Sequence, residues 1–388
     1  MSLKEEALAR HRRFRGKIAT SVKVPLKTQR DLVLAYTPGV AEVSREIVRN
    51  PESVYDYTSK WNTIAVVTDG SRVLGLGNIG AEAALPVMEG KAALFKEFGC
   101  VDAVPLCLST QDAEEIVKIV KAVSPNFGGI NLEDIETPKV LEIKERLIKE
   151  LNIPVFHDDG DGTAVVTLAG LTNALKVVGK KLEEVTIIIA GAGSAGYEIA
   201  RILHKVGARR IIVVDSKGII YRGRKEGMNR FKEALAKITN PENITGGLVD
   251  ALKGADVFIG VSAVPNLLNA EMIRSMAREP IIFALTNPDP EILPDEARSA
   301  GASVVATGSS QFPNQANNLL VFPGFFRGLL DARAKAVTDE MKIAAAEAIA
   351  GLVGKRELSA GRILPQAVDR KIARKVAQAV CESAAKLP

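Results

Sequence analysis

Two short acidic segments carry the residues best suited to hold a metal ion. Glu133 and Asp134 lie in INLEDI, and Asp158 and Asp159 lie in HDDGDG, each after a short apolar run typical of a strand. These carboxylates could converge at one edge of a sheet, where oxygen ligands with no cysteine nearby suit Mg²⁺ or Mn²⁺. A calcium loop starting at Asp159 is disfavoured, because Ala164 would stand where that loop needs glycine. Solvent-facing acidic turns are the alternative for either segment alone.

Two glycine-rich loops, GLGNIG at residues 75–80 and GAGSAG at residues 191–196, have the spacing of a dinucleotide-binding turn. Only the second has the expected surroundings. The strand-like VTIIIA precedes it, a helix is predicted from Ser194, and the next strand-like run, IIVVD, ends at Asp215. The sequence therefore predicts a nucleotide site at the second loop. The first is predicted to be a tight connection between a strand and a helix.

The residues of GAGSAG each have a physical part in that site. Gly191 would allow the tight turn, Gly193 would let the backbone approach a pyrophosphate, and Gly196 would let the helix pack close to the sheet. The helix start at Ser194 and Ala195 would offer free amides to the phosphates. We expect a nicotinamide dinucleotide here, with its ribose at the carboxylate that ends the next strand.

The whole chain reads as a globular protein of two domains. It has 388 residues, of which 47% are hydrophobic and 25% are charged, and its net charge is only +5. The charges are interspersed, so nucleic acid is not an expected partner. No signal peptide or membrane span is found. Cys100, Cys107 and Cys381 are best explained as buried free thiols in a reducing cytoplasm, which is the predicted location.

The order of elements predicts an α/β fold. Residues 1–50 look helical, NTIAVVTDG and SRVLGLG look like a hairpin around an Asp-Gly turn, and strands then alternate with helices. From residue 185 the alternation is strict, as in a Rossmann-like doubly wound parallel sheet. The tail from about residue 330 is helical. We expect a smaller N-terminal α/β substrate and metal domain at residues 1–160 and a nucleotide-binding domain with C-terminal helices at residues 161–388.

A series of motifs, in this order, resembles the malic enzymes in their small form. The resemblance implies oxidative decarboxylation of L-malate to pyruvate and CO₂, with reduction of NAD(P)⁺ and a divalent metal. It also places GLGNIG in the substrate domain. A related hydroxy-acid dehydrogenase that does not decarboxylate, or a non-catalytic nucleotide-binding relative, are the alternatives. The motifs are AYTPGVA, VTDGSRVLGLGNIG, VMEGKAAL, INLEDI, HDDGDGTA, GAGSAG, FALTNPDP and QANNLLVFPG.

The resemblance implies roles for ionisable residues of the N-terminal part. Lys91 corresponds to the base that takes the malate hydroxyl proton, and Asp158 would orient it. A lysine out of water beside a cation has a lowered pKa, which suits a base near neutral pH. Tyr36 corresponds to the acid that protonates the enol carbon, and Arg72 to the residue that pairs with a malate carboxylate. Taken alone, each would be read as an ordinary solvated or half-buried side chain.

The same resemblance supplies the remaining contacts. Glu133, Asp134 and Asp159 would bind Mg²⁺ or Mn²⁺. Asn287 and Asn318 correspond to amides that contact the substrate, and Asn287 would also contact the cofactor. His157 is expected to be structural support, not a base.

Cofactor choice and assembly complete the expectations. Asp215 favours NAD, because a carboxylate accepts from the ribose 2′-hydroxyl and repels a 2′-phosphate. Lys217, Arg222 and Arg224 could offset that repulsion, so we predict NAD with measurable NADP use. A homodimer or homotetramer is implied by the resemblance. The helical segment before Tyr36 is a plausible exchange surface.

Overall fold

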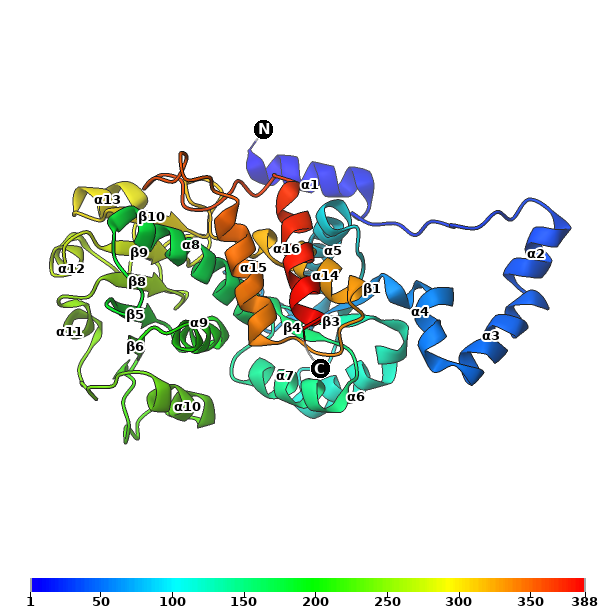
Figure 1. Ribbon diagram of the computed structural model, residues 1–388, viewed down its shortest axis with the longest axis horizontal. Coiled ribbons are helices and arrows are strands. Elements are labelled where there is room, and N and C mark those ends of the chain that lie inside the picture. The colour runs from blue at the N-terminus through cyan, green and yellow to red at the C-terminus, as the bar shows by residue number, and fades with distance from the viewer. Residues whose placement is uncertain (1, 387–388) are drawn as a thin grey trace.

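The computed structural model describes residues 2–386 and has two separate sheets (Figure 1). The first sheet has four parallel strands in the order β2-β1-β3-β4, so the carboxyl ends of all four meet at one edge. Helices α5, α6 and α7 connect its strands, as parallel strands require. The bounds are β1 Thr63–Thr68, α5 Gly80–Gly99, β2 Asp102–Cys107, α6 Ala113–Val123, β3 Gly129–Leu132, α7 Lys139–Glu150 and β4 Val155–His157.

The second sheet has six strands in the order β10-β9-β8-β5-β6-β7. Ile187 and Ile189 belong to one buried cluster and Ile188 to another, so β5 is covered on both faces, as its apolar run predicts. Strand order reverses beside β5, between β6 and β8. The bounds are α8 Thr163–Val178, β5 Thr186–Ala190, α9 Ser194–Lys205, β6 Arg210–Asp215, β7 Gly218–Ile219, α10 Arg230–Ile238, α11 Leu248–Leu252, β8 Val257–Gly260, α12 Ala270–Arg274, β9 Ile281–Ala284, α13 Pro294–Ser299 and β10 Val304–Thr307.

The C-terminal helices return to the first sheet. They are α14 Phe322–Asp331, α15 Asp339–Gly351 and α16 Lys371–Ala384. Phe322 of α14 packs against Phe95 of α5 with ring centroids 4.6 Å apart, and Phe325 packs against Phe156 of β4 at 4.8 Å. One buried cluster therefore joins residues of both sheets. The division at residue 160 stays a prediction.

The N-terminal segment lies largely outside this body. It comprises α1 Leu3–Phe14, α2 Gln29–Ala35, α3 Gly39–Arg49 and the short α4 Val54–Tyr57. Ser2 and Thr28 cap α1 and α2 with reciprocal side-chain and backbone hydrogen bonds. Figure 1 shows α1 beside α5, followed by an extended connection to α2 and α3, which project from the body.

The mixed α/β architecture with parallel sheets is confirmed, but two local predictions are wrong. No hairpin forms around Asp69, because no strand follows it before α5 and the Gly70 carbonyl instead accepts from the backbone amides of Ile79 and Gly80 at the start of that helix. The chain then enters α5 directly, so the 75–80 loop is a strand-to-helix connection, as predicted. Strand β7, which was not predicted, pairs antiparallel with β6.

The three cysteines are free, but the prediction that all are buried is wrong, since Cys100 is exposed at the end of α5. Within residues 2–386, no helix combines the length and apolarity needed to cross a bilayer.

Candidate functional site

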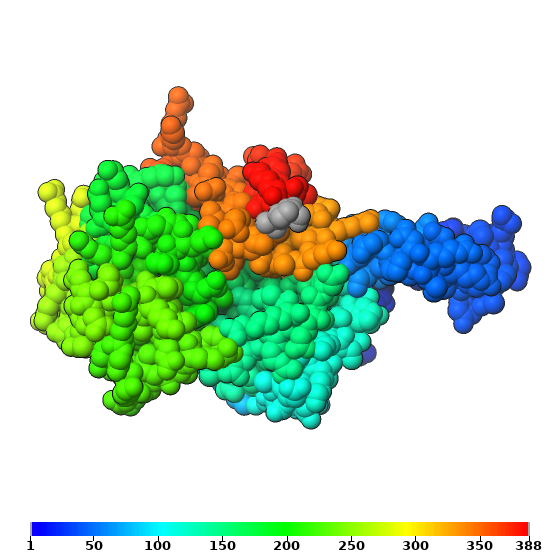
Figure 2. All heavy atoms as spheres, turned by 60° about the horizontal axis from the view of Figure 1, so that its bottom comes forward, coloured from blue at the N-terminus to red at the C-terminus, as the bar shows by residue number. Residues whose placement is uncertain are grey.

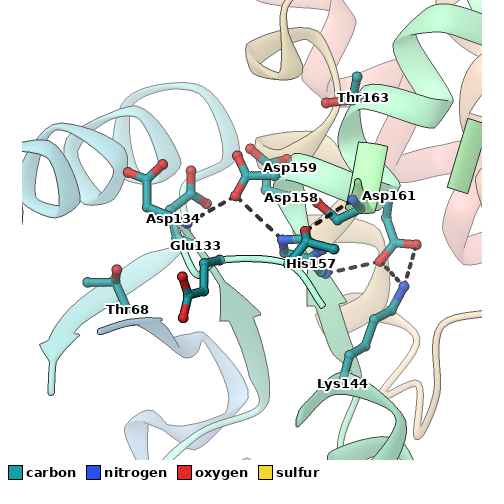
Figure 3. A network of polar contacts seen from close by, with 12 residues as sticks. Thr68, Glu133, Asp134, Lys144, His157, Asp158, Asp159, Asp161 and Thr163 are labelled. Carbon is teal, nitrogen blue, oxygen red and sulfur yellow. Dashed lines mark hydrogen bonds and ion pairs between the residues drawn. The ribbon is translucent and has the colours of Figure 1, made fainter. Parts of the chain in front are cut away.

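Three carboxylates meet at the carboxyl edge of the first sheet. Leu132 of β3 pairs with His157 of β4, so the acidic residues that follow the two strands become neighbours. Carboxylate oxygens of Glu133, Asp134 and Asp159 all lie within 4.8 Å of one another. Figure 3 shows these side chains gathered beside the ends of the two strands. This placement follows from the parallel register that the sequence suggested.

The electrostatics of this cluster fit a divalent cation. Burial, the neighbouring Lys91 and three carboxylates act on Glu133, and the net effect raises its pKa well above the usual range. Burial and then the Asp159 carboxylate raise the pKa of Asp134 to about 7. Burial opposes ionisation of Asp159, but the imidazole of His157 and the backbone amide of Asp134 lower its pKa to about 2. Crowded acids that raise one another's pKa are stabilised when a cation neutralises them.

Lys91 links the acidic cluster to α5. Its ammonium is 2.7 Å from Glu133 Oε1, also pairs with Asp158, and lies 4.2 Å from the centroid of the Phe322 ring. Burial lowers the pKa of Lys91, but the carboxylates of Asp158 and Glu133 outweigh it and raise the pKa. In this structure the two carboxylates therefore keep Lys91 in its ammonium form, whereas a lowered pKa was expected for this lysine beside a cation.

Asp158 is fixed on several sides. Its backbone carbonyl accepts from Asn318 Nδ2 at 3.0 Å, and Asn318 Oδ1 accepts from the hydroxyl of Thr163 at 3.1 Å. A side chain at Gly162 would lie 2.2 Å from Asp158 Oδ1, so the single helical turn over residues 158–162 needs glycine there. Asn318 thus holds the loop that presents Asp158 to Lys91.

The predicted nucleotide loop lies at the point where the strand order of the second sheet reverses. Gly191 follows β5 with φ of +121°, and a side chain there would lie 2.7 Å from the Val261 carbonyl oxygen beyond β8. A side chain at Gly196 would lie 1.9 Å from the Gly191 carbonyl oxygen. The start of α9 follows, with the Ser194 amide donating to Thr137 Oγ1 at 3.2 Å. This is the crevice where doubly wound sheets bind dinucleotides.

Asp215 ends β6, as predicted, but its carboxylate already has partners. Arg224 donates to both of its oxygens, and Lys232 donates to Oδ2 at 2.7 Å. The backbone amide of Lys217 donates to Oδ1 at 2.8 Å. Burial raises the pKa of Asp215, but the hydrogen bonds from Arg224 and Lys232 outweigh it and lower the pKa to about 2. Arg222 instead donates to carbonyls of α10.

One cavity of about 680 Å³ brings most of the predicted site residues together. Its walls come from the first sheet and α5 on one side and from the loops after β5, β8 and β9 on the other. Tyr36 is not among its lining residues, and Asp215 lies beyond it. The predicted residues that line it are Arg72, Lys91, Glu133, Asp134, Asp158, Asp159, Gly193, Ser194, Ala195, Asn287 and Asn318.

A second charged cluster was missed from the sequence. Asp161 is fully buried and accepts from Lys144 at 2.8 Å and from Lys342 at 3.2 Å, while Lys144 also pairs with Glu198 at 2.7 Å (Figure 3 shows Lys144 and Asp161). Asp161 also accepts from the backbone amide of His157 at 3.0 Å. These residues come from α7, α9, α15 and the acidic loop, and no sequence motif connects them.

Fold and cavity together define a class of protein. A carboxylate cluster and a buried lysine face the loop of a dinucleotide fold across one cleft, which is the arrangement of a nicotinamide-dependent oxidoreductase.

Comparison with known proteins gives the family. Residues 15–148 match the model of the malic enzyme N-terminal domain, and residues 161–385 match that of the malic enzyme NAD binding domain. The chain is 56% identical to a bifunctional malic/malolactic enzyme of Bacillus subtilis, over 99% of this chain and 93% of that protein. It is 49% identical to an NADP-dependent malic enzyme of Rhizobium meliloti, over 90% of this chain and 46% of that protein.

A solved structure agrees. The NAD-dependent malic enzyme of Thermotoga maritima superposes with a TM-score of 0.93 at 52% identity, over 97% of this chain and 98% of that one. The chain therefore belongs to the malic enzyme family.

Proposed function

We propose that this chain oxidises L-malate with NAD(P)⁺ and decarboxylates the product to pyruvate and CO₂. The observation that carries the proposal is Lys91, held between Asp158 and Glu133 in the cavity that the nucleotide loop also lines. Oxidation of a secondary alcohol needs a base beside a hydride acceptor, and loss of the neighbouring carboxylate needs an electron sink at the new ketone. The cavity has residues suited to each requirement.

Glu133, Asp134 and Asp159 would hold Mg²⁺ or Mn²⁺, and their mutual crowding supports this assignment. When bound, such a cation polarises the ketone oxygen and accepts the charge that decarboxylation releases. A cation would also reduce the effect of these carboxylates on Lys91, which favours the neutral amine that a base requires. Lys91 would then take the hydroxyl proton, with Asp158 orienting its amine through their direct contact.

The remaining roles concern binding and the final proton. Arg72 lies beside the nucleotide loop, since a side chain at Gly193 would be 3.7 Å from Arg72 Nη1. The Arg72 guanidinium would pair with a malate carboxylate. Asn287 and Asn318 line the same cavity and would donate to the substrate. Residues 191–196 would hold the pyrophosphate, with Asn287 near the nicotinamide. Tyr36 would protonate the enol carbon.

Cofactor preference and location are proposed on separate observations. The Asp215 carboxylate at the end of β6 favours NAD, while Arg224 and Lys232 beside it give that edge a net positive balance that tolerates a 2′-phosphate. NAD with measurable NADP use is the proposal. The three unpaired cysteines support a reducing, cytoplasmic location.

The deciding experiment measures CO₂ release together with NAD(P)H formation from L-malate. Both are expected, in equal amounts. NAD(P)H without CO₂ would favour a hydroxy-acid dehydrogenase, and neither product would favour a non-catalytic relative. Lys91→Ala is expected to lose both malate oxidation and pyruvate reduction, while the matched change Lys118→Ala, at an exposed lysine of α6, leaves both intact. Near-native turnover of Lys91→Ala would contradict the base assignment.

A further inference from the structure

The turn that carries Asp158 and Asp159 presents these carboxylates to other acids. It covers residues 158–162, directly after β4, and one oxygen of Asp159 lies within 4.8 Å of oxygens of Glu133 and Asp134. Like charges at this distance repel each other, most of all when no cation lies between them. The turn must therefore be held in place by contacts outside the acidic cluster.

Asp161 makes such contacts from inside the same turn. Its Oδ2 accepts from the backbone amide of His157 at 3.0 Å, which closes the turn onto the end of β4. The imidazole Nε2 of His157 lies 3.4 Å from Oδ2 of Asp159. Figure 3 shows these contacts as one path from Asp159 through His157 to Asp161. The direction of the Asp159 carboxylate is thus tied to the position of Asp161.

The Asp161 side chain is itself anchored to helices beside both sheets. Its carboxylate pairs with Lys144 of α7 at 2.8 Å and with Lys342 of α15 at 3.2 Å. Glu198 of α9 pairs with the same two lysines, at 2.7 and 3.6 Å. These four residues form the Asp161 cluster, and none of their side chains is more than 10% exposed. The cluster therefore fixes the turn against the body of the protein.

The turn also packs closely between neighbouring side chains. A side chain at Gly160 would lie 2.9 Å from Nδ1 of His157 and 3.2 Å from Cγ of Glu198. The backbone of the turn is therefore in contact with the imidazole on one side and with the Asp161 cluster on the other. This packing leaves the turn little room for a second arrangement.

Asp161 does not face the substrate. It is not among the residues that line the 680 Å³ cavity around Lys91, but it lines a separate cavity of about 410 Å³ together with Lys144 and Lys342. Ions lose their hydration when they are buried, and apolar side chains of similar volume often stabilise a fold equally well or better. Stability alone therefore does not explain the cluster, whereas a role in fixing one arrangement of the turn does.

We propose that Asp161 is a positioning residue for this turn. It keeps Asp159 directed at the metal and Asp158 directed at Lys91. The inference rests on the proposed function, because it takes Asp159 as a metal ligand and Lys91 as the base. Loss of Asp161 would let the turn move away from the other two ligands. Residues that orient metal ligands commonly contribute about ten- to a hundredfold to metal affinity, so the effect should appear in metal binding.

Mn²⁺ binding to the metal-free protein tests this role without any need for turnover. The full chain is treated with a chelator and titrated in a calorimeter, well below the melting temperature of each variant. Asp161→Ala is expected to weaken Mn²⁺ binding at least about tenfold. Asp161→Asn keeps an oxygen that can accept from the His157 amide, so it should bind Mn²⁺ more tightly than Asp161→Ala. Both variants lose the same charge, and their difference therefore reports on the position of the turn.

Lys342→Met tests the same role from the other side of Asp161. It removes one anchor of the carboxylate and leaves the turn itself unchanged. Loss of a positive charge would by itself tighten the binding of a cation. Weaker Mn²⁺ binding by Lys342→Met is therefore expected only if the anchor positions the turn. This variant also serves if Asp161→Ala does not fold.

Leu252→Ala is the matched control for lost stability. Leu252 of α11 is fully buried in the same cluster as Ile188, whereas α9 packs in the cluster on the opposite face of the second sheet. The control should lower the melting temperature and leave the affinity for Mn²⁺ unchanged, because it does not contact the turn.

The two ways in which the idea can fail are distinct. Wild-type affinity for Mn²⁺ in folded Asp161→Ala or Lys342→Met protein would overturn the positioning role, and so would equal weakening by Asp161→Asn and Asp161→Ala. Wild-type affinity in Asp159→Asn would mean that the metal site itself is wrongly assigned, and the proposed function would lose its cation along with this inference.

Discussion

At the scale of single residues, the sequence indicated which carboxylates would meet, but not which positively charged side chain would contact them. Glu133, Asp134 and Asp159 follow strand-like runs, and the rule that parallel strands end at one edge predicts their convergence. The contacts of Lys91 with two of the acids depend on the distance between α5 and the sheet, which no local pattern encodes. That distance decides which charges surround Lys91 when no cation is bound, and the lowered pKa expected beside a cation stays a prediction.

The raised pKa of Asp134 predicts how Mg²⁺ stabilises the protein. The folded, metal-free chain holds a proton on Asp134 up to about pH 7, whereas the unfolded chain loses it near pH 4. This contribution therefore makes the metal-free fold less stable as pH rises through that window. Mg²⁺ binds the ionised acids, so its stabilising effect in thermal unfolding should be larger at pH 8 than at pH 6.

Asp134→Asn should abolish most of the Mg²⁺-induced rise in melting temperature at both pH values. Asp295→Asn, at a carboxylate that is 97% exposed, should leave it unchanged. Equal stabilisation by Mg²⁺ at pH 6 and pH 8 in the wild type would contradict the assignment of Asp134 as a ligand that must lose its proton.

Cofactor selectivity is a second prediction at this scale. Lys232 contributes one of the two cations at Asp215, and it was missed because it lies on the following helix, outside the motif. Lys232→Met should lower the catalytic efficiency with NADP relative to NAD by about tenfold, since each 1.4 kcal/mol of lost attraction is a factor of ten. Asp215→Ser should move the ratio the other way.

Lys237→Met, on the same helix but exposed, is the matched control and should leave the ratio of the two efficiencies unchanged. A ratio unaffected by both Lys232→Met and Asp215→Ser would place cofactor discrimination elsewhere in the chain.

At the scale of elements, the buried cluster around Asp161 holds four of them together. Lys144 of α7 and Lys342 of α15 each pair with Asp161 of the acidic loop and with Glu198 of α9. Asp161→Asn would leave these lysines short of negative charge in a buried site. We expect it to lower the free energy of unfolding by about 3–5 kcal/mol at pH 7.

Chemical denaturation measures this loss. Glu114→Gln, which breaks an ion pair with Arg146 in which both side chains are well exposed, should cost no more than about 1 kcal/mol. Burial raises the pKa of Asp161, but Lys144 and Lys342 outweigh it and lower the pKa below its usual value. The stabilisation is thus complete above the unfolded value near pH 4 and is lost below it. A cost for Asp161→Asn that persists undiminished at pH 2 would contradict the ionic account.

The helices and strands could be predicted where the sequence pattern that specifies them is local. The apolar β-branched runs gave β5, β6, β8 and β9 because both faces of those strands are buried. The hairpin prediction failed because an Asp-Gly turn fits several connections, and here Gly70 lies under the start of α5. Strand β7 has two residues, too few to show the alternating pattern by which a strand is recognised in a sequence.

At the scale of the whole molecule, the C-terminal helices join what the sequence suggested as separate domains. Phe326 of α14 lies edge-on to Phe95 of α5, with ring centroids 5.3 Å apart, and also contacts Phe156 of β4. The sequence placed this helix with the nucleotide-binding part, because order along the chain was the only guide. The position of Tyr36 could not be predicted either, since no sequence pattern determines how the N-terminal helices, which project from the body in Figure 2, are placed relative to the rest of the chain.

This shared core predicts that both parts of the chain unfold together. Calorimetry should give one transition, and NAD⁺ should raise its midpoint as a whole, because the ligand binds only the folded state. Phe326→Ala removes a fully buried ring from the shared cluster and should cost about 3–5 kcal/mol. Leu293→Ala, at a side chain that is 51% exposed, should change the stability little. Two separate transitions, of which NAD⁺ shifts only one, would mean that α14 does not couple the two sheets.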